Sequence, residues 1–178
     1  MQVKLSWRGL PLIIFLILMF FLWRGLSLDP HALPSTVLGK KLPKFDLPAL
    51  DPAQPRLNSD HLRGHIMLLN IWGSWCPACA EEQVFLMQLA RSGVLIYGLN
   101  YKDDEQNARG WLAEWGNPYI SVAVDSSGRN AMSLGVYGAP ETFLIDAGGV
   151  LIYRHAGPMN LDVWNSDFLP KIQALQPK

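Results

Sequence analysis

A run of apolar residues leads directly into two closely spaced cysteines, and this junction limits the possible folds more than any other feature. Residues 66–72 read IMLLNIW, which is typical of a strand buried on both faces of a sheet. Residues 77–91 place apolar side chains at helical spacing and stop before Gly93, which predicts a helix. Cys76 and Cys79 therefore lie where a buried strand passes into a helix.

The rest of the chain alternates apolar runs with amphipathic segments. The pattern predicts strands at residues 94–99, 120–125, 142–146 and 150–155, and helices at 104–115, 128–134 and 161–175. The last helix is expected to be kinked or restarted at Pro170. Residues 147–149 read AGG and indicate a hairpin between the last two strands. Residues 45–63 are interrupted by prolines and favour an edge strand or loops. Together these elements predict an α/β fold in which helices flank a mixed sheet.

The position of the two cysteines predicts thiol chemistry. Cys76 lies at the amino terminus of the predicted helix, where free N–H donors and the helix dipole favour a thiolate. Pro77 suits the first helical turn, because its missing N–H is not needed there. Cys79 follows nearly one turn later, close enough to form and reopen a disulfide with Cys76. We therefore predict that Cys76 is an exposed nucleophile that attacks a substrate disulfide, and that Cys79 resolves the mixed disulfide.

Other uses of a cysteine pair fit the sequence less well. A c-type haem site would need a histidine after Cys79, where Ala80 stands. A zinc site would need further ligands, and His61, His65 and His155 lack metal-ligand spacing. A purely structural disulfide across so short a loop would add little stability. The sequence therefore predicts a redox pair with no metal and no cofactor.

The amino-terminal segment predicts an attachment to a membrane. Residues 9–23 carry no charge and follow Lys4 and Arg8. This pattern favours an uncleaved transmembrane anchor at residues 9–28, because Arg24 can extend its charged end to the membrane surface. A cleaved secretory signal and a soluble helix are the alternatives.

The charge distribution gives an orientation and excludes one class of partner. The basic residues before the apolar run favour a cytoplasmic segment at residues 1–8 and export of the rest, which in a bacterium gives a single-pass inner-membrane protein with its carboxyl-terminal part in the periplasm. Residues 29–44 resemble a linker, and residues 45–178 form the predicted domain.

Three of the 15 basic residues precede residue 29, so the rest of the chain holds 12 basic and 15 acidic residues. No basic stripe remains that would indicate binding to nucleic acid.

Three segments together resemble a known family. They are LLNIWGSWCPAC at residues 68–79, GLNYKDD at 98–104 and GVYGAPETFLID at 135–146. With these segments in order after an apolar amino terminus, the chain resembles the membrane-anchored CcmG/DsbE family of cytochrome c maturation. The resemblance implies a thioredoxin-like fold in which the helix and strand of residues 104–125 are an insertion.

The family resemblance also implies partners and a direction of electron flow. Such proteins keep the haem-binding cysteines of apocytochrome c reduced, directly or through a partner thiol protein, and are re-reduced by a transmembrane thiol carrier of the DsbD/CcdA type. A general periplasmic reductase of the TlpA/ResA kind is an alternative, and a haem- or copper-binding chaperone is an alternative from a different class. The Cys-x-x-Cys framework alone does not set the direction, because it spans roughly −270 to −120 mV.

Several residues around the cysteines take their expected roles from the resemblance. Ala139 and Pro140 match the loop whose cis-proline faces the cysteines and pairs with an extended substrate peptide. Trp75 is expected to offer apolar contact area to a partner, next to Pro77. Glu141 follows the loop and is expected beside the site, although a solvated loop acid is the simpler interpretation.

One further residue is a candidate for proton transfer. Typical thioredoxins have a buried aspartate six residues before the first cysteine, and this chain has Asn70 there, which cannot titrate. We therefore expect Glu82, with a contribution from Glu141, to carry the proton of Cys79. The alternative for Glu82 is an ordinary acid in the first turns of a helix. Because these carboxylates would oppose a thiolate, we expect a reducing protein.

Overall fold

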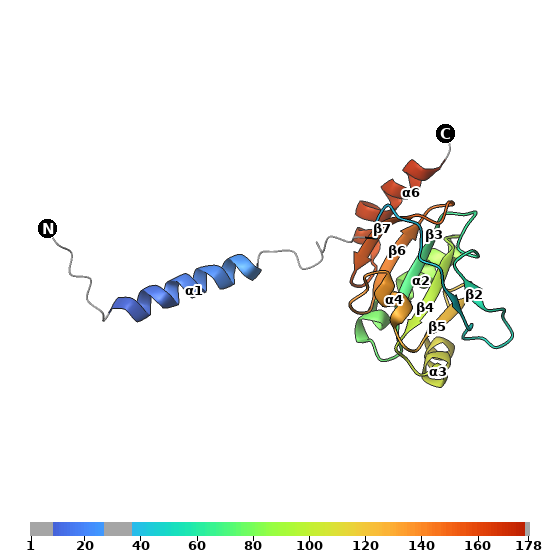
Figure 1. The fold of residues 1–178 in the computed structure, drawn as a ribbon, viewed down its shortest axis with the longest axis horizontal. Coiled ribbons are helices and arrows are strands. Elements are labelled where there is room, and N and C mark those ends of the chain that lie inside the picture. Colours follow the sequence, from blue (N-terminus) through green and yellow to red (C-terminus); the bar gives the residue numbers. More distant parts are fainter. Residues whose placement is uncertain (1–8, 27–36, 177–178) are drawn as a thin grey trace. The chain divides into compact units, whose positions relative to one another are not determined.

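The computed structural model describes residues 9–26 and 37–176. Two compact units divide near residue 34, and the second contains the sheet (Figure 1). The predicted cytoplasmic segment at residues 1–8 and the first half of the predicted linker at 29–44 lie outside the described residues.

The helix of the first unit is α1 (Leu10–Leu26), which is 17 residues long and carries Arg24 in its last turn. Its large apolar side chains are exposed from Leu10 to Trp23. Among the described residues, no helix combines the length and the apolarity that crossing a membrane requires.

The second unit is built on a five-stranded mixed sheet with the order β5-β4-β3-β6-β7 (Figure 1). Its strands are β3 (Met67–Trp72), β4 (Ile96–Tyr101), β5 (Val122–Asp125), β6 (Glu141–Ile145) and β7 (Leu151–Ala156). β3 pairs in parallel with β4 and antiparallel with β6, and it is buried along its whole length, as the apolar run predicted. The register places Asn70 of this central strand between Gly98 and Thr142.

Helices cover both faces of the sheet. The face that contains Leu68 and Trp72 packs against α2 (Pro77–Arg91), α3 (Glu105–Trp115) and the carboxyl-terminal helical segment. The opposite face packs against α4 (Arg129–Ser133). This is the α/β arrangement that the sequence predicted.

The predicted insertion forms one side of this unit. α3 and β5 follow β4 in the chain, and β5 is the edge strand of the sheet. The segment expected to be an edge strand or loops instead forms a small separate hairpin of β1 (Asp46–Leu47) and β2 (Leu57–Asn58). Between them, Ala49 bridges to Ala123 and thereby covers part of the free edge of β5.

Three elements differ from their predicted form by two residues or more. β5 begins at Val122, two residues after the predicted start. β4 begins at Ile96, two residues after the predicted start, because pairing with β3 begins there, opposite Leu68. The carboxyl-terminal helix is divided into α5 (Leu161–Val163), a π-helical turn (Trp164–Phe168) and α6 (Leu169–Leu175). The wide turn comes shortly before Pro170, which has no N–H to continue a regular helix.

Candidate active site

The two cysteines lie at the start of α2, directly after β3. Cys76 caps the helix and Pro77 occupies the first turn, so α2 has the bounds that the sequence predicted. The N–H of Cys79 donates to Cys76 Sγ over 3.1 Å. The two residues are joined as a disulfide, with Cα atoms 5.3 Å apart. After reduction, the same N–H and the helix dipole favour a thiolate at Cys76.

Cys76 is buried, and the prediction that it is exposed is wrong. Only 3% of the surface of Cys76 and 2% of that of Cys79 are accessible. The carbonyl oxygen of Ala139 lies 3.4 Å from Cys76 Sγ, so the loop before β6 packs against the sulfur. Trp75 and Pro77 are the exposed residues at this point. A partner disulfide must therefore fit this rim before it reaches the sulfur.

The loop beside the cysteines has the conformation that the resemblance implied. The Ala139–Pro140 peptide bond is cis. Pro140 is buried, and its carbonyl oxygen accepts a hydrogen bond of 2.9 Å from the N–H of Gly157, just after β7. The end of β7 thereby fixes the loop that contacts Cys76.

Glu141, the first residue of β6, is held by an opposite charge. Arg154 Nε donates to Glu141 Oε2 over 2.6 Å, and the two side chains are only 6% and 4% exposed. The other carboxylate oxygen accepts from the N–H of Tyr137 over 3.1 Å. The interpretation of Glu141 as a solvated loop acid is therefore wrong. Its carboxylate fastens residues 137–141 to β7, and its charge is compensated there.

Glu82 is also buried, but no opposite charge accompanies it. Glu82 is 1% exposed, and it takes part in none of the ion pairs found among the described residues. One oxygen accepts from Asn70 Nδ2 over 2.8 Å, and the other accepts from the N–H of Met159 over 2.7 Å. Burial raises the pKa of Glu82 to about 7, against the opposing effect of these two hydrogen bonds. Glu82 can therefore gain or lose a proton near neutral pH.

The geometry brings Glu82 and Cys79 to the same side of α2. They are three residues apart on the helix, and both are buried. Asn70 links Glu82 to two further polar groups. Its Nδ2 also donates to Thr142 Oγ1 over 3.0 Å. Its Oδ1 accepts from Tyr119 Oη over 2.8 Å. The neutral residue at the thioredoxin aspartate position is thus the centre of a buried network.

Trp75 lies at the rim of the site. It is 50% exposed, and its Nε1 donates to the carbonyl oxygen of Tyr101 over 3.1 Å. A side chain at Gly73 would collide with the Trp75 ring, so this close packing requires glycine. The ring therefore presents a fixed apolar surface beside Cys76.

Asp103 is a site residue that the sequence interpretation missed. Its carboxylate accepts from the N–H and the hydroxyl of Ser74, at 2.6 and 2.7 Å, and from Asn100 Nδ2 at 2.8 Å. Ser74 follows β3 and Asp103 follows β4, and these strands are parallel neighbours whose carboxyl ends meet. The sequence could have predicted this contact, because polar residues that follow neighbouring parallel strands come together at one edge of the sheet. Asp103 anchors the segment that leads into Cys76.

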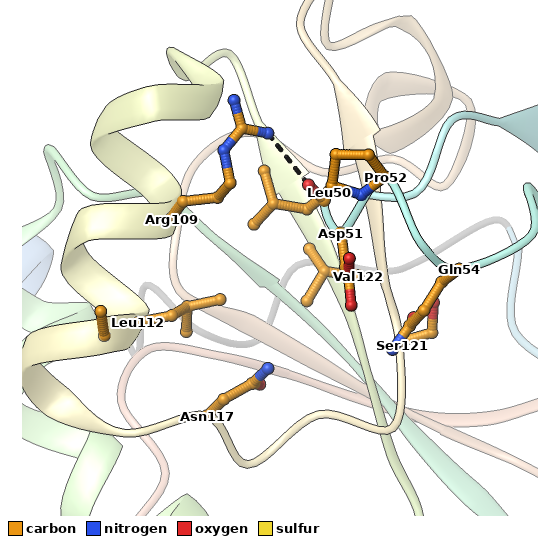
Figure 2. Close-up of a pocket in the computed structure, with 10 residues that line it drawn as sticks. Leu50, Asp51, Pro52, Gln54, Arg109, Leu112, Asn117, Ser121 and Val122 are labelled. Carbon is orange, nitrogen blue, oxygen red and sulfur yellow. Dashed lines mark hydrogen bonds between the residues drawn. The ribbon is translucent and has the colours of Figure 1, made fainter.

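A separate cavity of about 340 Å³ lies between α3 and the chain after β1 (Figure 2). Leu112 and Val122 line it, and Arg109 Nη1 donates to the carbonyl oxygen of Leu50 over 3.0 Å, tying the helix to that segment. None of the predicted site residues lines this cavity. Within the described part of the chain, no group of three or more His, Cys, Asp or Glu side chains is placed to hold a metal ion.

Comparison with known proteins agrees with this geometry. The family model described as Redoxin matches residues 38–168. The thiol:disulfide interchange protein DsbE of Pseudomonas aeruginosa is 48% identical over 166 residues, which cover 93% of this chain and 92% of that protein. The protein of that name from Escherichia coli (strain K12) is 46% identical over 167 residues, 90% of each. The chain belongs to the DsbE (CcmG) family.

Solved structures show the same fold. A protein from Chlorobium tepidum that is described as a thiol:disulfide interchange protein DsbE has a TM-score of 0.62 at 25% identity, covering 84% of this chain and 99% of that one. A secreted thiol-disulfide isomerase from Corynebacterium glutamicum has a TM-score of 0.66 at 21% identity, covering 82% and 96%. This DsbE-family chain is a thiol–disulfide oxidoreductase with a thioredoxin-like fold, and its Cys-x-x-Cys pair is Cys76 and Cys79.

Proposed function

We propose that this chain is the periplasmic reductant of cytochrome c maturation, held at the bacterial inner membrane by residues 9–28 as a single-pass anchor. Its clients are the disulfides of apocytochrome c or of a partner thiol protein, which must be reduced before haem is attached. A transmembrane carrier of the DsbD/CcdA type returns the spent protein to its dithiol form. Identity of 46–48% to proteins named DsbE, over at least 90% of their length, supports this assignment.

The reaction transfers two electrons to the client disulfide. The Cys76 thiolate attacks one client sulfur, the client disulfide breaks, and the departing client thiolate takes up a proton. Cys79 then gives its proton to Glu82 and attacks the Cys76 sulfur. The second client sulfur leaves as a thiolate and takes up a proton, and the protein is left with a Cys76–Cys79 disulfide. Two thiols of the carrier reduce that disulfide in the reverse sequence.

The observation that carries the reducing direction is the uncompensated carboxylate of Glu82. An ionised carboxylate close to a thiol opposes thiolate formation there. Reduced oxidoreductases whose thiolate is strongly stabilised are oxidants, as in DsbA, and those with a less stabilised thiolate are reductants. A buried Glu82 with only neutral hydrogen-bond donors therefore favours a protein that gives electrons away.

A trapping experiment on the full chain in its membrane tests the client. Cys79→Ser leaves the Cys76 nucleophile but removes the resolving thiol, so a client stays attached as a mixed disulfide. We expect enrichment of apocytochrome c or of one thiol protein of haem attachment. A Cys76→Ser/Cys79→Ser variant is the matched control and should capture nothing. Capture of many unrelated exported proteins, without that enrichment, would contradict the proposal and indicate a general TlpA/ResA-like reductase.

A further inference from the structure

Tyr119 reaches the redox centre from the insertion. It lies in the loop between α3 and β5, and it is buried. Its ring stacks on Trp72 with a centroid separation of 5.6 Å and an interplanar angle of 19°, and its N–H donates to Asn117 Oδ1 over 2.9 Å. Gly98 makes room for this stack, because a Cβ there would lie 3.1 Å from the Tyr119 ring. The position of the Tyr119 hydroxyl is therefore fixed by packing.

The hydroxyl of Tyr119 sets the orientation of the Asn70 amide relative to Glu82. Asn70 Oδ1 is the hydrogen-bond partner of Tyr119 Oη, and the described residues provide no other. If the amide turned over, its oxygen would face the Glu82 carboxylate and the hydroxyl proton of Tyr119 would lose its acceptor. Only a protonated Glu82 could then donate to Asn70. The Tyr119 hydroxyl thus disfavours the flipped Asn70 amide, in which Glu82 would have to be protonated.

We propose that Tyr119 is a positioning residue, whose hydroxyl holds the Asn70 amide with its N–H toward Glu82 so that the carboxylate can ionise and receive the proton of Cys79. The last step rests on the proposed role of Glu82 in the reaction. The insertion that distinguishes this chain from a minimal thioredoxin fold thereby supplies part of the proton path. Asn70 transmits the effect, because its two ends contact Tyr119 and Glu82 at 2.8 Å each.

The groups around Glu82 support this assignment. From β3 it is faced by Asn70, and from the chain before α5 by the N–H of Met159. On its own helix the neighbouring titratable residues are Glu81, which is exposed, and Cys79, which is buried. Burial raises the pKa of Tyr119 well above its ordinary value, and the negative charge of Glu82 raises it further. The hydroxyl therefore stays protonated, and stays a donor, wherever Glu82 titrates.

Tyr119→Phe tests the proposal, because it removes the hydroxyl and keeps the ring that stacks on Trp72. The full chain in detergent, oxidised and labelled with ¹³C at the Glu carboxyl carbon, is titrated by NMR. The Glu82 resonance is identified by its loss in Glu82→Gln. We expect the midpoint of Glu82 to rise by about one pH unit in Tyr119→Phe. The rate of mixed-disulfide resolution should fall by up to tenfold below the new midpoint.

Tyr153→Phe is the matched control, because it removes a tyrosine hydroxyl that donates to Asp167 over 3.1 Å. It should leave the Glu82 midpoint unchanged. Asn70→Ala removes the donor itself and should raise the midpoint at least as much as Tyr119→Phe. An unchanged midpoint in Tyr119→Phe would overturn the positioning role, whatever the exchange rates do. A raised midpoint, with the same resolution rate and pH profile in Glu82→Gln as in the unmodified chain, would support the positioning by Tyr119 and refute the proton transfer by Glu82.

Discussion

Two buried glutamates of this domain, Glu82 on α2 and Glu141 at the start of β6, have the same side chain and opposite surroundings. Glu141 is paired with Arg154 at 2.6 Å, inside the hairpin of β6 and β7. Glu82 receives only neutral donors, from Asn70 and from the N–H of Met159. A buried charge must be compensated or it gives way to the neutral form. The carboxylate of Glu141 therefore anchors the cis-proline loop. The carboxylate of Glu82 instead titrates, on the same helix as the two cysteines.

Removing the partner of Glu141 should lower the stability of the fold most. Arg154→Met leaves a buried carboxylate without its opposite charge, which should cost about 3–5 kcal/mol in the free energy of unfolding. Arg56→Met is the control, because Arg56 pairs with Asp46 at the surface, where both side chains are more than half exposed. That variant should cost at most about 1 kcal/mol. Urea unfolding of both variants measures the difference. Equal losses would show that the buried ion pair of Glu141 contributes no more than a surface pair.

The second effect concerns the dependence of stability on pH. Because the pKa of Glu82 is raised from 4.5 to about 7 in the folded chain, the folded state holds a proton that the unfolded state has lost between these values. The contribution of Glu82 to stability is therefore largest below pH 4.5 and falls as pH rises to about 7, by on the order of 3 kcal/mol. Glu82→Gln should remove this fall from the unfolding free energies of the oxidised protein.

Glu105→Gln is the control for that experiment, since Glu105 is an exposed carboxylate paired with Arg109 on α3. Its stability curve should keep the slope of the unmodified chain between pH 5 and 7. If the Glu82→Gln curve ran parallel to that of the unmodified chain, Glu82 would not titrate in this range. The contrast with Glu141 would then be lost.

A third carboxylate, that of Asp103, should have the smallest effect. Asp103 is held by neutral donors, like Glu82, but it is only partly buried and serves the backbone before Cys76. Asp103→Ala should cost about 1–3 kcal/mol and slow disulfide exchange, because Ser74 loses both hydrogen bonds. Asp104→Ala, which removes the cap of α3, should cost about 1 kcal/mol and leave exchange unchanged. Equal exchange rates in the two variants would contradict the anchoring role of Asp103.

The sequence predicted the elements more completely than it predicted their contacts. α2 and β3 were predicted well because Pro77, Gly93 and a continuous apolar run mark their ends chemically. The start of β4 was missed, because an apolar run does not reveal where pairing begins. The burial of Cys76 depends on a loop more than 60 residues later in the chain, which local patterns do not contain.

The candidate site shows the same limit. Glu82 was found because its spacing from Cys79 is helical, but its charge state depends on Asn70 and Met159, which come from other elements. The pairing of Glu141 was recoverable in principle. The hairpin of β6 and β7 places Arg154 opposite Phe143, two residues along the strand from Glu141. Tyr119 offered no local signal, since only the assembled sheet brings it to Asn70.

The redox potential of the full chain shows whether the protein is a reductant or an oxidant. The oxidised protein in detergent is equilibrated with glutathione buffers, and the free thiols of Cys76 and Cys79 are counted by alkylation. The uncompensated carboxylate of Glu82 predicts a potential below roughly −200 mV, toward thioredoxin. A potential near −120 mV, like that of DsbA, would mean that the protein is an oxidant and that the Glu82 carboxylate does not set a reducing potential.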